Sequence, residues 1–159
     1  METALLALNG WLDALGLVAW TRGSAHVYPW ANILHVLGVV LLVGGIGVVD
    51  LRVAGLWRAL PLESLSRVLT PVALAGLILQ AGSGLVLFAA DGEALAVSST
   101  FHLKLGLLAL ALLNAAAFRL RWRKAGGRDR PSGLARASAM FSLLLWLAIA
   151  TAGRLIAYY

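Results

Sequence analysis

Residues 29–57 read PWANILHVLGVVLLVGGIGVVDLRVAGLW, an apolar run with one histidine, His35, near its start and the triplet Asp50-Leu51-Arg52 near its end. A helix of about 20 apolar residues is long enough to cross the hydrocarbon core of a bilayer. An imidazole inside hydrocarbon is costly unless a partner satisfies it. The run therefore predicts a membrane span, and it raises the question of which group His35 contacts.

The composition of the whole chain agrees with a membrane protein. Its 159 residues are 61% hydrophobic and 13% charged, with a mean hydropathy of +0.88, whereas soluble domains average about 45–50% apolar and about 25% charged residues. There is no cysteine, which excludes disulfides, thiolate metal sites and cysteine nucleophiles. The net charge of +6 comes largely from basic residues that flank apolar runs, so we expect contact with the lipid bilayer and no binding of nucleic acid.

Three further apolar runs follow the first, and together they predict an all-α, four-helix transmembrane bundle in which residues 1–159 form a single integral membrane domain. The predicted spans cover about residues 30–50, 71–90, 101–119 and 137–157. Pro71 is expected in the first turn of its helix, where a missing N–H costs little. Residues 91–100, DGEALAVSST, are expected to form a short loop.

Residues 1–22, METALLALNGWLDALGLVAWTR, place leucines at helical spacing but interrupt them with polar residues. Two interpretations are open, an amphipathic helix lying in the membrane interface or an additional span. Two tryptophans and Asp13 favour the interfacial helix. Gly23-Ser24 is expected to end it.

The distribution of positive charge predicts the orientation. The stretch after the first span carries Arg52, Arg58 and Arg67, and the third span ends in RLRWRKAGGRDR (119–130), whereas residues 91–100 carry two acidic residues and no basic one. Basic loops stay in the cytoplasm. We therefore expect a multi-pass protein of the bacterial inner membrane with both termini outside.

Two histidines are expected at similar depth in this arrangement. His35 lies about five residues into the first span and His102 lies at the outer beginning of the third, which puts them within about two helical turns of each other in depth. Membrane b-type cytochromes hold one haem iron between two histidines from different helices. The pair therefore predicts haem b with His35 and His102 as metal ligands. The alternative for His35 is a neutral imidazole hydrogen-bonded to a neighbouring helix.

Other residues could complete such a site, and each also has an ordinary structural role. Lys104 and Arg154 could hold haem propionates, or their side chains could extend to the outer interface. Gly38 and Gly106 could let a flat macrocycle approach, although small residues are also how membrane helices pack, which we consider the simpler explanation. His26, expected in an outer loop, is the reserve ligand if His102 is not one.

Short motifs resemble a known group of proteins. ILHVLG in the first span, DLRVAGLW at its inner end and FHLKLGLLALALLN in the third span resemble small bacterial four-helix integral membrane proteins of poorly known function. A looser likeness is to the membrane-bound protoporphyrinogen oxidase family and the copper-resistance D-type proteins. The oxidase resemblance implies a b-type haem, with His35 matching an early functional histidine and His102 with Lys104 matching a later H-x-K-L motif. The sequence lacks the further histidine expected after that motif.

Two functions from different classes follow. The first is a membrane b-type haem protein for electron transfer or haem-linked oxidoreduction, with a redox protein or a quinone as partner. The alternative is a non-enzymatic membrane module, either an assembly subunit or a transporter-like protein for a small solute or metal, in which the glycine stripes form contacts of a homo-oligomer. No sequence motif identifies a substrate pocket, so catalytic activity is left open.

Overall fold

The computed structural model describes residues 1–124 and 131–156, apart from the side chains of Arg123 and Lys124. Within these residues the fold is helical and contains no strand. The elements in chain order are α1 (Glu2–Ala14), α2 (Leu17–Gly23), α3 (Val27–Ala54), α4 (Leu62–Val97), α5 (Ser99–Lys124) and α6 (Gly133–Leu155).

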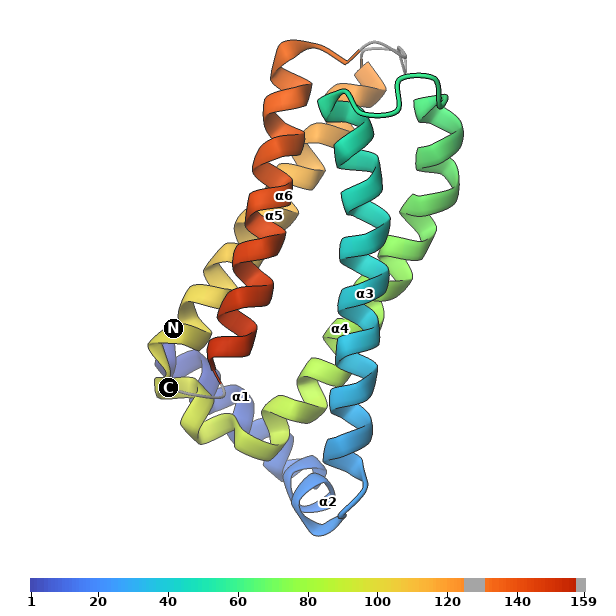
Figure 1. Cartoon of the computed structure of the whole chain (residues 1–159). Helices are drawn as coiled ribbons and strands as arrows, with labels where there is room; N and C mark the ends of the chain where they lie inside the picture. Colours follow the sequence, from blue (N-terminus) through green and yellow to red (C-terminus); the bar gives the residue numbers. More distant parts are fainter. Residues whose placement is uncertain (125–130, 157–159) are drawn as a thin grey trace.

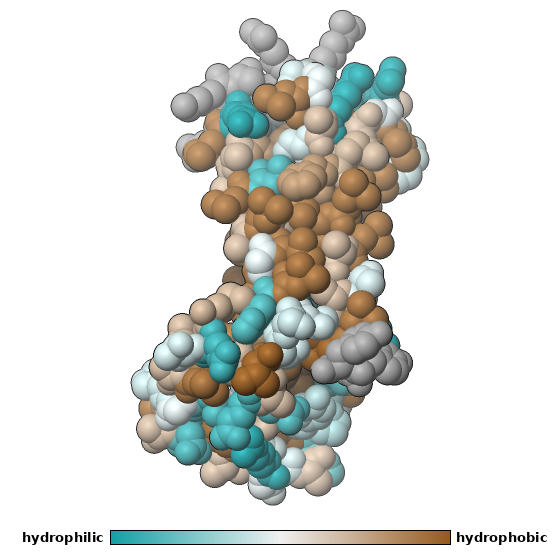
Figure 2. All heavy atoms as spheres, turned by 90° about the vertical axis from the view of Figure 1, so that its left-hand side faces the viewer, coloured by the Kyte–Doolittle hydropathy of each residue, from teal (hydrophilic) through white to brown (hydrophobic). Residues whose placement is uncertain are grey.

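Four of these helices, α3 to α6, are long and apolar enough to cross a membrane, as the sequence predicts. Their outward side chains are apolar: Val40, Ile78, Leu113 and Leu144, one on each helix, are between 61% and 67% exposed. Exposed apolar area on this scale is unfavourable in water but is what a lipid-facing surface requires. On the face drawn in Figure 2, apolar side chains gather across the narrow middle of the molecule, and hydrophilic ones are more frequent toward its two ends.

The four long helices run alternately up and down, as two hairpins (Figure 1). α3 packs extensively on α4, α5 packs on α6, and α3 also contacts α6, whereas α4 and α5 barely touch. We call the end at which α3 leads into α4 the basic end, and the opposite end, which carries α1 and α2, the N-terminal end. The described residues of both chain termini lie at the N-terminal end, which agrees with an even number of spans.

Glycines bring α3 and α4 into close contact. A Cβ at Gly38 would lie 2.9 Å from the Gly76 carbonyl oxygen, and one at Gly76 would lie 2.8 Å from the Gly38 carbonyl oxygen. About two helical turns further along α3, a Cβ at Gly45 would lie 3.1 Å from the Ala73 Cβ. Backbones this close exclude any larger side chain, so these glycines serve helix packing.

Apolar side chains form three buried clusters, one at each end and one in the middle. The middle cluster joins the two hairpins and contains Leu42, Ala73, Ala111, Leu145, Trp146 and Ile149. The cluster at the N-terminal end packs Leu12 and Val18 against Phe88 and Ala89 of α4. The cluster at the basic end contains Val53, Leu62 and Ala139.

The helix that carries the second predicted span, about residues 71–90, extends beyond it at both ends. α4 begins at Leu62, so Pro71 lies inside the helix and not in its first turn, and the helix continues through the expected loop to Val97 with a kink at Asp91 (φ −125°, ψ 25°). At 1.5 Å per residue its 36 residues are about 54 Å long, well beyond a hydrocarbon core of roughly 30 Å. The fourth helix also begins earlier than predicted, at Gly133; residue 157, the predicted end of its span, lies outside the described residues.

The predicted single helix over residues 1–22 is also wrong. α1 and α2 meet at an angle of 77°, because Gly16 adopts φ +75°, a left-handed conformation that suits glycine. α1 rests on the kinked part of α4, where the Asn9 side chain lies directly over Gly92. The two helices together are apolar enough to count as one bent span, so both original interpretations of this segment stay open.

Candidate functional site

His35 is tied to α4 by a serine. Its Nδ1 lies 3.1 Å from the Ser83 Oγ, and the Ser83 hydroxyl lies 2.6 Å from the Leu79 carbonyl oxygen. A hydroxyl has one proton, so if Ser83 donates it to Leu79 it can only accept from His35. The ring proton then sits on Nδ1, and Nε2 keeps its lone pair.

The surroundings of His35 are otherwise tight on the α4 side. The Gln80 side chain donates through Nε2 to the His35 carbonyl oxygen at 3.3 Å. A Cβ at Gly84 would lie 3.3 Å from the His35 Cε1, so the ring lies directly against the backbone of α4. Gln80, Ser83 and Gly84 thus position the imidazole from one side.

Lys104 of α5 approaches the same region from the other hairpin. Its ammonium lies within electrostatic range of the His35 ring. The side chain runs along α6 at Gly153, where a Cβ would lie 3.5 Å from Nζ. A half-buried basic side chain in a membrane bundle, within electrostatic range of a histidine, is a candidate for binding an anionic group or exchanging protons.

His102 does not share this environment. Its Nε2 lies 2.7 Å from the carbonyl oxygen of Ala96, a fully buried residue near the end of α4. A carbonyl accepts, so Nε2 of His102 carries a proton and donates it. In this geometry His102 holds the corner between α4 and α5, and its Nε2 is not available to a metal.

The remaining predicted site residues lie in several places. His26 is exposed at the N-cap of α3, and Arg154 is exposed in the last turn of α6. Gly106 is exposed, with nothing within 4 Å of where a Cβ would be. Gly38 lies in the α3–α4 contact, where protein fills the space beside it.

A second group of polar side chains lies between α3 and α6, nearer the basic end. The Ser142 hydroxyl interacts with the Asp50 carboxyl group, and the Asp50 Oδ2 is buried without a hydrogen-bond partner among the described residues. The buried Nε1 of Trp146, one turn along α6 from Ser142, also lacks one. Trp146 is 3% exposed, so it lies in the bundle interior.

A hydrogen-bonded pair connects α5 to α6. Asn114 donates through Nδ2 to the Ser138 carbonyl oxygen at 3.1 Å, and the Ser138 hydroxyl donates to the Asn114 Oδ1 at 2.8 Å. Both hydrogen-bonding groups of the amide are therefore satisfied by one residue. Such pairs hold membrane helices together.

The residues present fit a haem iron in part. A histidine that ligates haem iron through Nε2 needs an acceptor at Nδ1–H, and His35 has one in Ser83. His102 fits only if its Nε2 leaves the Ala96 carbonyl. No group of three or more histidine, aspartate or glutamate side chains that could hold a bare metal ion occurs among the described residues.

Sequence reasoning missed the two serines that matter most to this geometry. Ser83 stands in the run GSGL, and Ser142 stands in an otherwise apolar run. A hydroxyl inside a predicted span can be found from the sequence, but which helix it faces depends on the packing. Comparisons of the chain with protein-family models, curated proteins and solved structures give no match, so the resemblance drawn from short motifs stays a prediction.

Proposed function

We propose that this protein is a membrane b-type haem protein for electron transfer or haem-linked oxidoreduction, in which His35 would hold the haem iron through Nε2. The observation that carries the proposal is the hydrogen bond between the His35 Nδ1–H and Ser83, which orients the ring and leaves Nε2 as the lone-pair atom. Lys104, which approaches from the opposite hairpin, would pair with a propionate. Haem bound there would supply a one-electron carrier.

The role of His102 in this proposal is conditional on its own hydrogen bond. To act as the second ligand, His102 would have to break its hydrogen bond to the Ala96 carbonyl oxygen and bind the iron instead. The proposal therefore rests on His35, and the variants at the two histidines have different expected results.

We also propose that the basic end faces the cytoplasm of a bacterium and that both termini face outside. Support comes from the described arginines that gather at that end, namely Arg52, Arg58, Arg67, Arg119, Arg121 and Arg136. Under this orientation His35 and Lys104 lie in the outer half of the bilayer.

Absorption spectra of the purified full-length chain test the proposal. The protein is prepared from haem-replete cells, and spectra are recorded before and after dithionite reduction and after titration with hemin. We expect a Soret band that shifts on reduction in the native chain. We expect it to be lost in His35→Ala and retained in His26→Ala, the control at the exposed histidine. A spectrum of His102→Ala that changes from six- to five-coordinate identifies His102 as the second ligand, and an unchanged one excludes it.

A specific observation favours the second candidate, a non-enzymatic membrane module. Both His35 and His102 already have hydrogen-bond partners inside the protein, and Gly38 packs against α4. On this alternative both imidazoles connect helices and neither binds a cofactor. A native chain that stays colourless after hemin titration rules out the haem proposal and leaves this one.

A further inference from the structure

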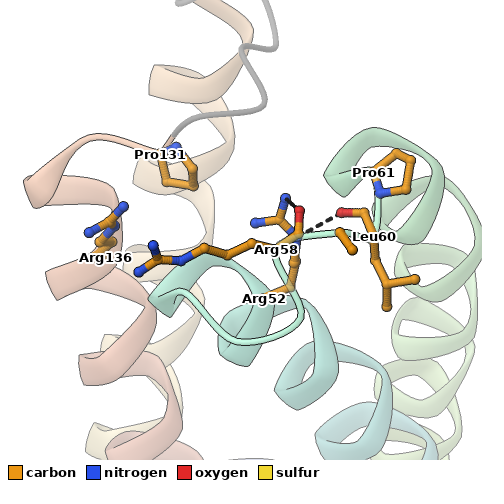
Figure 3. Close-up of a pocket in the computed structure, with 7 residues that line it drawn as sticks. Arg52, Arg58, Leu60, Pro61, Pro131 and Arg136 are labelled. Atoms are coloured by element: carbon orange, nitrogen blue, oxygen red, sulfur yellow. Dashed lines mark hydrogen bonds between the residues drawn. The ribbon is translucent and has the colours of Figure 1, made fainter.

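A pocket with a volume of about 470 Å³ lies at the basic end, between the α3–α4 connection and the start of α6. Its walls include Arg52, Arg58, Leu60, Pro61, Pro131 and Arg136 (Figure 3). Pockets of about 300–1,000 Å³ hold small molecules in other proteins. The pocket is separate from His35, which lies toward the N-terminal end of α3.

Three arginines line this pocket, and no described acidic residue lines it with them. Glu63, close by in the sequence, pairs with Arg67 on the exposed side of α4 at 2.8 Å. Arg58 extends from the α3–α4 connection toward Arg136 on α6 (Figure 3), so two cations that repel each other are placed together.

Arg52 forms a part of the pocket wall that is held in place by hydrogen bonds. Its side chain is 5% exposed, and it donates through Nε to the Leu60 carbonyl oxygen at 2.7 Å and through a terminal nitrogen to the Arg58 carbonyl oxygen at 3.2 Å. A guanidinium has five N–H groups, and these two bonds use two of them. The bonds also position the backbone from which Arg58 projects.

Helix dipoles add to the positive potential. α4 begins directly after Pro61 and α6 begins directly after Ser132, so the N-terminal ends of two long helices lie beside the pocket. The N-terminus of a helix carries a partial positive charge and favours anions. α6 has no acidic residue in its first turn and has Arg136 there instead, an arrangement that is unfavourable until an anion is present.

We propose that this pocket binds a phosphate group. Arginine matches the planar, two-oxygen recognition of phosphate, and Arg58 with Arg136 would hold the group between them while Arg52 contributes its remaining N–H groups. The same chemistry is offered by the headgroup of an anionic phospholipid and by a soluble phosphomonoester.

Thermal unfolding of the full-length chain in detergent, followed by tryptophan fluorescence, tests the proposal. The probes are phosphatidylglycerol in mixed micelles, phosphatidylcholine in the same micelles, and glycerol 3-phosphate in solution. The test variant is R58Q/R136Q. The matched control is R119Q/R121Q, which removes the same charge from exposed arginines of α5 outside the pocket.

We expect phosphatidylglycerol or glycerol 3-phosphate to raise the unfolding temperature of the native chain and of the control. In R58Q/R136Q we expect the dissociation constant for that probe to rise by about tenfold or more, as the loss of charge-assisted hydrogen bonds implies. Stabilisation by the lipid alone identifies a headgroup as the ligand, and stabilisation by glycerol 3-phosphate identifies a soluble one. Equal weakening in both variants, an equal effect of phosphatidylcholine, or no effect of any probe would overturn the proposal.

Discussion

His35 and Ser83 form the one described side-chain to side-chain hydrogen bond between α3 and α4, with 3.1 Å between Nδ1 and Oγ. The Ser83 hydroxyl is also 2.6 Å from the Leu79 carbonyl oxygen, and donation to that carbonyl favours the His35 tautomer with its proton on Nδ1. This hydrogen bond does not depend on a cofactor, so it can be tested by measuring the free energy of unfolding.

Ser83→Ala should destabilise the chain by about 1 kcal/mol, because it leaves the His35 Nδ1–H without an acceptor inside the protein. The measurement is the free energy of unfolding in a denaturing-detergent titration. Ser64→Ala, at an exposed position of the same helix, is the control and should change it little. In a double-mutant cycle with His35→Ala the two changes should not be additive. Additivity would mean that the bond contributes nothing.

Gly76→Ala should weaken the α3–α4 contact, since its Cβ would lie 2.8 Å from the Gly38 carbonyl oxygen and the backbones would have to separate. We expect a loss of about 1–3 kcal/mol, as for overpacked sites in general. Gly82→Ala is the matched control on the same helix, because nothing lies within 4 Å of its Cβ position. That substitution should be neutral or slightly stabilising, as alanine favours a helix over glycine. The prediction fails if both variants unfold alike.

The pair between Asn114 and Ser138 should couple α5 to α6. Asn114→Ala removes both hydrogen bonds, whereas Ser138→Ala removes only the one donated by the hydroxyl, because the other is accepted by its backbone. We therefore expect Asn114→Ala to cost more, with a coupling energy of about 0.6–2 kcal/mol in a double-mutant cycle. Equal losses for the two single variants would argue that the backbone bond is not made.

The orientation can be tested directly because the native chain has no cysteine. Single cysteines at Glu93, exposed at the N-terminal end, and at Ser64, exposed at the basic end, serve as reporters. With a membrane-impermeant maleimide on spheroplasts, we expect Glu93→Cys to be labelled and Ser64→Cys to be labelled only after lysis. The reverse pattern would place the basic end outside.

The existence and order of the four spans could be predicted because each is a long apolar run, a signal that does not depend on contacts. The ends of the helices could not be predicted, because they depend on contacts. α4 starts nine residues before Pro71, and it continues past Asp91 because the kinked segment packs against α1. The break at Gly16 also escaped prediction, since one glycine in a helical pattern is usually tolerated.

The candidate site could be predicted only in part, because the sequence shows the residue types but not how the helices pack. His35 was identified by residue type and depth alone. Its partner Ser83 depends on the rotation of α3 against α4, and the bond from His102 to Ala96 goes to a backbone carbonyl, which no side-chain pattern reveals.

The division into two hairpins has a consequence for biogenesis. α4 ends at Val97, so all residues of the extensive α3–α4 contact have been synthesised once the chain reaches that residue. This hairpin can therefore form in the membrane while the rest of the chain is still being synthesised. α5 contacts α4 only slightly, and its main partner, α6, follows it in the chain and therefore leaves the ribosome later. The second hairpin therefore has to assemble late and join the first along α3 and α6, where Asp50 and Trp146 lie. Until it does, the Asp50 carboxyl group lacks the Ser142 hydroxyl of α6 with which it interacts in the folded protein.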